Sequence, residues 1–134
     1  MRYISTEGYI NDGVLTFELN QPCNCLIGLV DFHLPSINQR SNSENTIDIS
    51  CDQIDSAFDN PKRLLKRLCF DKVTDTEYYN HWEAKHVEFK RVDSQDKFLT
   101  FRVSRTIGRP NIKFVKSIDD PQIFYTIAFK PITE

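Results

Sequence analysis

Apolar and polar residues alternate with a period of two along much of the chain, and turn-forming residues separate the alternating segments. The longest nearly uninterrupted apolar run is CLIGLVDFHL at residues 25–34, and Pro35 ends it. Its β-branched residues favour a strand, Gly28 disfavours a helix, and the spacing of Pro22 and Pro35 fits strand length. We therefore expect a buried central strand here, around which the rest of the chain is organised.

Two further strands are predicted before the central one. Residues 3–6 fit a short edge strand, and the turn signal NDG at residues 11–13 leads into a strand at residues 14–19. This second strand meets the central one across residues 20–22. The pair forms either a hairpin or the opposing faces of two packed sheets.

A long polar loop and a regularly alternating strand follow the central run. Residues 35–45 are mostly polar, and long loops in compact domains often carry function. Residues 46–51 alternate with period two, which predicts a strand with one buried face. The core-facing residues are Ile47, Ile49 and Cys51, and the solvent-facing ones are Asp48 and Ser50.

The segment at residues 62–70 fits both a helix and a strand. It follows a loop at residues 55–60, and the pair Asn60-Pro61 resembles a helix cap followed by a first-turn proline. The leucines that would share one helical face are Leu64, Leu65 and Leu68. The end of the segment suits a strand, and its surroundings are β structure, so we predict a strand there with one helical turn before it.

The second half of the chain contains the clearest hairpin signal. Residues 87–92 alternate, residues 93–96 are turn formers, and residues 98–103 alternate again, which together predict a hairpin. Residues 112–115 and 123–129 are predicted as two more strands.

Together these segments give about eight predicted strands, and nowhere do the apolar residues keep a helical period over a long stretch. We therefore predict an all-β fold, an antiparallel β-sandwich, and the 134 residues fit a single domain over 1–134. Eight strands suit a jelly roll, but periodicity does not distinguish this strand order from an immunoglobulin-like one.

Charge and composition narrow the classes of partner. The net charge of −2 argues against a nucleic-acid partner, and no apolar run approaches the ~20 residues that span a bilayer. The amino end lacks the layout of a secretory signal, which predicts an intracellular protein whose thiols stay reduced. The cysteines are Cys23, Cys25, Cys51 and Cys69. Their spacing fits no zinc motif, so we expect no metal and no cofactor.

The residues that could perform catalysis form no recognisable motif. His33 and Asp31 point to the same strand face and could act as a base with its orienting carboxylate, although such pairs more often satisfy each other near a strand end. His81 and His86 are five residues apart, which places them on neither one helical face nor one strand face. We predict that the protein is not an enzyme.

Two groups of residues remain as candidate binding surfaces. The densest positive cluster comprises Lys62, Arg63, Lys66 and Arg67. The aromatic group comprises Tyr78, Tyr79 and Trp82. The first would contact phosphate through charge, and the second would stack on a base or a sugar. The simpler interpretations are a solvated face balanced by nearby acids and a cover over one end of the core.

The order of the segments resembles that of a known family. The segments that carry this resemblance are 26–32 (LIGLVDF), 45–54 (NTIDISCDQI), 64–68 (LLKRL), the Tyr78-Tyr79 stretch, 87–103 and 124–130 (FYTIAFK). Together they resemble the carboxy-terminal β domain of capsid-like proteins encoded by Polinton/Maverick elements and adintovirus-like viruses. The likeness covers most of the chain from Leu26 onward.

This resemblance implies a jelly roll without catalytic activity that helps to assemble a shell, as a vertex or minor capsid component. The implied partners are further copies of the chain or other capsid-like proteins, and the implied location is the virion. The alternative that the residues leave open is a monomeric β-sandwich that binds a ligand or a protein.

Overall fold

Nine β-strands form the described part of the protein, and no helix occurs among the described residues. The computed structural model describes residues 2–8, 14–33, 46–69, 81–105 and 123–132. The strands are β1 (Arg2–Gly8), β2 (Val14–Glu18), β3 (Cys23–His33), β4 (Thr46–Cys51), β5 (Leu64–Cys69), β6 (His81–Glu83), β7 (Lys90–Ser94), β8 (Phe98–Arg105) and β9 (Ile123–Lys130). This confirms the predicted all-β fold.

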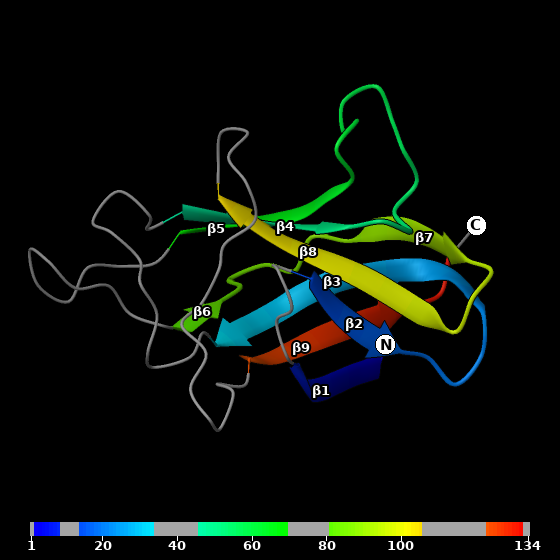
Figure 1. Ribbon diagram of the computed structural model, residues 1–134, viewed down its shortest axis with the longest axis horizontal. Helices are drawn as coiled ribbons and strands as arrows, with labels where there is room; N and C mark the ends of the chain where they lie inside the picture. The colour runs from blue at the N-terminus through cyan, green and yellow to red at the C-terminus, as the bar shows by residue number, and fades with distance from the viewer. Residues whose placement is uncertain (1, 9–13, 34–45, 70–80, 106–122, 133–134) are drawn as a thin grey trace, which may run out of the picture.

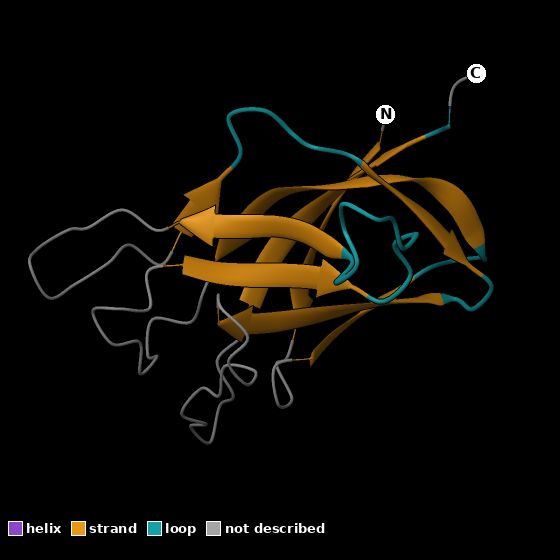
Figure 2. Ribbon diagram, turned by 90° about the horizontal axis from the view of Figure 1, so that it is seen from above, coloured by secondary structure: helices purple, strands orange, loops and turns teal. Residues whose placement is uncertain are grey.

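The strands are arranged in two antiparallel sheets, which lie one over the other in Figures 1 and 2. Sheet A has five strands: β1, β9 and β3 follow one another, and both β6 and β7 pair with the remaining edge of β3. Sheet B has four strands in the order β2-β8-β4-β5. The central run is therefore an interior strand, as predicted, and the β2–β3 connection joins opposing sheets instead of forming a hairpin.

The strand pairs are nested. β1 pairs with β9, β2 with β8, β3 with β6 and β7, and β4 with β5, as if one long hairpin had been folded over on itself. The pairs β3–β9 and β4–β8 then complete the two sheets. This strand order is that of a jelly roll, the alternative that periodicity left open.

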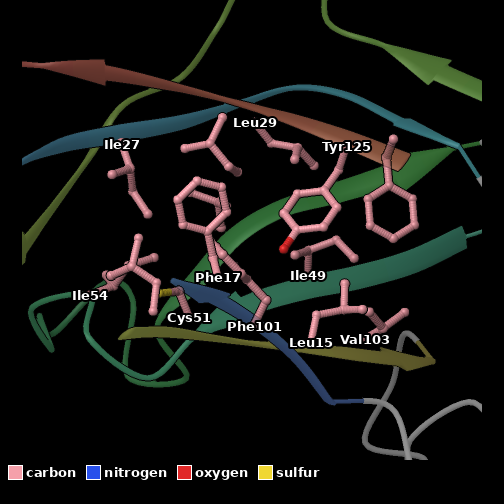
Figure 3. Close-up of a cluster of buried hydrophobic side chains, with 14 of the residues drawn as sticks. Leu15, Phe17, Ile27, Leu29, Ile49, Cys51, Ile54, Phe101, Val103 and Tyr125 are labelled. Carbon is pink, nitrogen blue, oxygen red and sulfur yellow. The ribbon is translucent and has the colours of Figure 1, made fainter. Parts of the chain in front are cut away.

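A single core fills the space between the sheets. Ile47, Ile49 and Cys51 all face it, as the alternation predicted, and none is more than 1% exposed. At its centre the Tyr125 ring lies 5.9 to 6.3 Å, centroid to centroid, from the rings of Phe17, Phe32 and Phe101. Figure 3 shows the Phe17, Phe101 and Tyr125 side chains meeting between the two layers.

A β-bulge changes which residues of β3 face the core. The strand spans Cys23–His33, two residues earlier at its start than the predicted 25–34. Its register against β9 shifts after Leu29, so that Val30 is an extra residue in β3. Because the bulge reverses the alternation, Leu29 and Phe32 are both buried although they are three positions apart, a spacing that would place them on opposite faces of a regular strand.

A second bulge explains the helix-like spacing of the leucines in β5. The register against β4 shifts so that Leu65 is the extra residue, and Leu65 and Leu68 both face the core. The predicted strand is confirmed, but the helical turn before it is wrong. A turn occupies residues 61–62, and β5 begins directly at Leu64.

The predicted hairpin over residues 87–103 is also wrong. β7 pairs with β3 in sheet A, whereas β8 lies between β2 and β4 in sheet B. The short connection crosses from one sheet to the other, and at its start the buried Ser94 hydroxyl lies 2.8 Å from Asp96 O and 2.9 Å from Phe98 O. A tight turn between alternating segments fits both arrangements, so the local pattern does not distinguish them.

Some predicted segments lie outside the described residues, among them the polar loop at 35–45 and the strand at 112–115. Over the described ranges there is no helix with the length and apolar character needed to cross a membrane.

Candidate functional site

The predicted basic cluster is divided between different surfaces. Arg67 lies on β5 and makes a two-pronged ion pair with Asp48 of β4, with Nε–Oδ1 and Nη2–Oδ2 distances of 2.7 and 3.2 Å. Lys66 instead extends toward sheet A, where its Nζ lies 2.8 Å from Glu88 Oε1. The pKa of the Arg67 guanidinium is raised by its hydrogen bond to Asp48 and by that carboxylate's charge. Two of the four cations are thus engaged within the protein.

The other two cations of the cluster lie at the end of the loop before β5. Lys62 and Arg63 are both exposed, and Arg63 adopts a left-handed backbone with φ of 55°, which is uncommon for a residue other than glycine. The Asn60 side chain closes this loop. Its Oδ1 accepts a hydrogen bond from the Leu64 N–H at 2.8 Å, and its Nδ2 donates to Leu64 O at 3.0 Å.

Of the predicted aromatic group, the described residues include only Trp82. It lies in β6 opposite Phe32 and is half-buried against the core. Tyr78 and Tyr79 lie outside the described residues. Trp82 therefore covers one margin of the core, which is the simpler of the two predicted roles.

The histidine of the central strand has a partner that sequence reasoning missed. His33 Nε2 lies 4.0 Å from Asp31 Oδ1, on the same face as predicted. On its other side the His33 ring stacks on the ring of His81, with centroids 4.1 Å apart and planes 13° apart. The two histidines are cross-strand neighbours of β3 and β6, and that pairing was unknown before the sheet order.

One surface hollow brings a cysteine near two histidines. A cavity of about 430 Å³ at the margin between β5 and β6 is lined in part by Cys69, His81 and His86. The described contact of the Cys69 thiol is with Thr46 Oγ1, at 4.0 Å. Covalent catalysis requires a nucleophile that is hydrogen-bonded to its base. That Cys69 and the two histidines line one cavity does not by itself provide this arrangement. Within the described part of the chain, no three His, Cys, Asp or Glu side chains are placed to hold a metal ion.

The loop between β4 and β5, residues 52–63, is fastened at its base to both sheets. On the side of sheet A, the Asp55 N–H donates to Arg91 O at 3.0 Å, and Ile54 forms an isolated bridge with Val92. On the side of sheet B, the Gln53 side chain accepts a hydrogen bond from the Thr100 N–H at 2.7 Å. This loop leaves the sandwich where β4 ends, and in Figure 1 it rises above β4 and β5, away from β1 and β9.

The tip of the β4–β5 loop displays a phenylalanine. The tip is a tight turn in which the Asn60 N–H donates to Ala57 O at 2.9 Å. Phe58 lies within this turn with a relative exposure of 104%. The exposed Asp59 follows it directly. The ordered turn therefore presents the whole phenyl ring to solvent.

The same end of the molecule also contains a pocket of about 580 Å³, which we call the terminal pocket. It lies where β1 and β3 begin and β9 ends, beside the β2–β3 connection. Its apolar lining includes Leu19, Cys23, Cys25 and Phe129, and its cations are Arg2 and Lys130. The Arg2 guanidinium carbon lies 5.5 Å from the centre of the Phe129 ring, which holds this cation over the apolar lining.

The Cys25 thiol of the terminal pocket is protonated at neutral pH. Burial raises the pKa of the Cys25 thiol to about 12, and the adjacent Cys23 raises it further, while Arg2 has a smaller opposite effect. Because the thiolate is the reactive form, Cys25 is a poor nucleophile here. The pocket is therefore suited to binding through apolar contact and positive charge.

Sequence reasoning did not identify the loop tip or the terminal pocket. A lone phenylalanine within the polar loop at 55–60 was the one available signal for the tip. The pocket combines residues from both ends of the chain, Arg2 and Lys130 among them, and that proximity follows from the pairing of β1 with β9.

Comparison with protein-family profiles, with curated proteins and with solved structures found no match to this chain.

Proposed function

We propose that this protein is a non-enzymatic structural jelly roll of the capsid type, which assembles with further copies of itself. In a shell it would serve as a vertex or minor component, and its location would be the virion or the cell in which virions assemble. The observation that carries the proposal is the nested strand order of the two sheets.

That strand order is shared by viral capsid, lectin and cupin domains, so the fold alone leaves the function open. Two features favour assembly among these. The first is the resemblance of the segment order to Polinton/Maverick and adintovirus-like capsid proteins. The second is the Phe58 side chain, which the described surface leaves wholly in solvent and which burial in a partner would remove from water.

The test is the native mass of the purified protein over a range of concentrations, by light scattering coupled to size exclusion. We expect a discrete closed assembly, such as a trimer or a pentamer, whose fraction rises with concentration. A mass equal to one chain at every concentration would contradict the proposal.

The terminal pocket supports a second candidate, a monomeric ligand-binding module. Its volume of about 580 Å³ lies within the range of small-molecule sites, and the cations Arg2 and Lys130 would favour an anionic ligand with an apolar body. For this candidate we expect a monomer that is stabilised against heat by such a ligand. Arg2→Glu should abolish that stabilisation.

A further inference from the structure

We propose that the tip of the β4–β5 loop docks into the terminal pocket of a second copy of the chain, with Phe58 as the anchor. This inference rests on the proposed self-assembly and names the surfaces that would carry it. The contact is head-to-tail: each copy contributes its tip to one neighbour and its pocket to another.

The tip has the chemistry of an interface anchor. The Phe58 ring is wholly exposed, so the isolated chain gains nothing from it, whereas burial in a partner would remove its apolar surface from water. The base of the loop is hydrogen-bonded to Arg91 in sheet A and to Thr100 in sheet B. Docking would therefore cost little ordering of the loop, which favours affinity.

The terminal pocket is complementary to this tip in both polarity and charge. Leu19, Cys23 and Phe129 offer an apolar lining to a phenyl ring. Arg2 and Lys130 add positive charge at the same pocket, and Asp59 directly follows Phe58 in the tip. Asp59 has no ion-pair partner within the described ranges, so its carboxylate remains available to these cations.

The positions of the tip and the pocket fit a repeated contact between copies. Val92 of β7 bridges to the base of the loop and pairs with Cys25, which lines the pocket, so the base of the loop and the pocket lie at the same end of the sandwich. They lie toward opposite edges of sheet A, since its order begins with β1 at the pocket and reaches β7 at the loop. One copy can thus engage two neighbours at once, and such a contact generates a ring when the rotation closes.

The experiment compares three variants of the full chain by light scattering coupled to size exclusion. Phe58→Ala removes the anchor, and the double substitution Arg2→Glu with Lys130→Glu reverses the charge of the pocket. We expect each to remain at the mass of one chain at concentrations where the wild type assembles. The matched control is Phe98→Ala, which removes an exposed phenylalanine that belongs neither to the tip nor to the lining of the terminal pocket, and it should assemble like the wild type.

Mixing the two defective proteins tests the head-to-tail geometry itself. The Phe58→Ala protein keeps an intact pocket, and the pocket variant keeps an intact tip, so an equimolar mixture restores a single contact. We expect a particle of two chains that does not grow further at higher concentration. Thermal unfolding of each variant, with an expected shift of less than about 2 °C for Phe58→Ala, shows that the fold is retained.

The outcomes separate this inference from the proposed function. If the wild type assembles and Phe58→Ala assembles equally well, this docking is wrong while self-assembly stands. The docking would also be overturned if Phe98→Ala prevented assembly as fully as Phe58→Ala does, or if the mixture of the two defective proteins stayed monomeric. A wild type that is monomeric at every concentration would overturn both proposals, and the pocket would then be a site for another ligand.

Discussion

At the scale of single residues, Tyr125 has an unusual position at the centre of the core. Its ring contacts three other aromatic rings, yet its hydroxyl is buried and has no hydrogen-bond partner among the described residues. Figure 3 shows this hydroxyl pointing from sheet A toward Ile49 of sheet B. Burying a hydroxyl without a partner costs free energy, so the oxygen opposes the stability that the ring provides.

We therefore expect Tyr125→Phe to raise the free energy of unfolding by about 1 kcal/mol at neutral pH, measured by urea denaturation. Burial raises the pKa of Tyr125 to about 12 from an ordinary value of 10.0. The unfolded chain thus ionises first, and the wild type loses stability above pH 10. The advantage of Tyr125→Phe should widen over that range. A destabilised variant would mean that the hydroxyl has a partner.

At the scale of elements, the position of the connection between β6 and β7 explains why β3 contains a glycine. The Ala84 N–H donates to Val30 O at 2.9 Å, and the chain then passes over the outer face of β3. A Cβ placed on Gly28 would collide with Val87 Cγ1 and lie 2.8 Å from Glu88 O. Gly28 therefore permits a close approach of another backbone segment.

Gly28→Ala should lower the free energy of unfolding by about 1–3 kcal/mol, since the Glu88 carbonyl belongs to the backbone and must shift. Combining it with Val87→Ala removes the side-chain collision alone, so the double variant should recover part of the loss. The measurement is a double-mutant cycle by chemical denaturation, with Val87→Ala as its second single variant. Additive effects of the two substitutions would contradict the proposed contact.

At the scale of the whole molecule, one edge of the sandwich is closed by an ion pair between the sheets. Lys66 belongs to β5, the edge strand of sheet B, and Glu88 belongs to the connection that lies over sheet A. The hydrogen bond from Lys66, followed by its charge, lowers the pKa of Glu88 below 4.5. Both side chains are partly in solvent, so the contribution to stability is small.

Because the pKa of Glu88 is lowered on folding, this contribution is present above pH 4.5 and is lost as the pH falls through the folded value. We expect Glu88→Gln to cost at most about 1 kcal/mol at pH 7. The difference from the wild type should vanish in denaturation curves recorded near pH 3. Glu83→Gln, at a nearby exposed carboxylate, is the control, and an equal effect there would contradict a specific pair.

The sequence by itself determined the local elements of this protein. Alternation in residues 46–51 and the apolar run at 25–34 predicted β4 and β3 correctly, because a half-buried strand must place apolar side chains on one face. The same reasoning predicted a sandwich. It misjudged the start of β5, since the bulge at Leu65 gives buried leucines a helical spacing.

The tertiary structure alone decided which strands pair and therefore which residues meet. The segments expected to form a hairpin over 87–103 belong to different sheets, because β7 pairs with β3 and β8 pairs with β4. The residues of a turn are a local signal, whereas strand pairing depends on which edges of distant strands are unoccupied. For the same reason, the sequence did not predict the terminal pocket, the stacked histidines or the Lys66–Glu88 pair. Each joins side chains whose proximity is set by strand order and not by any local pattern.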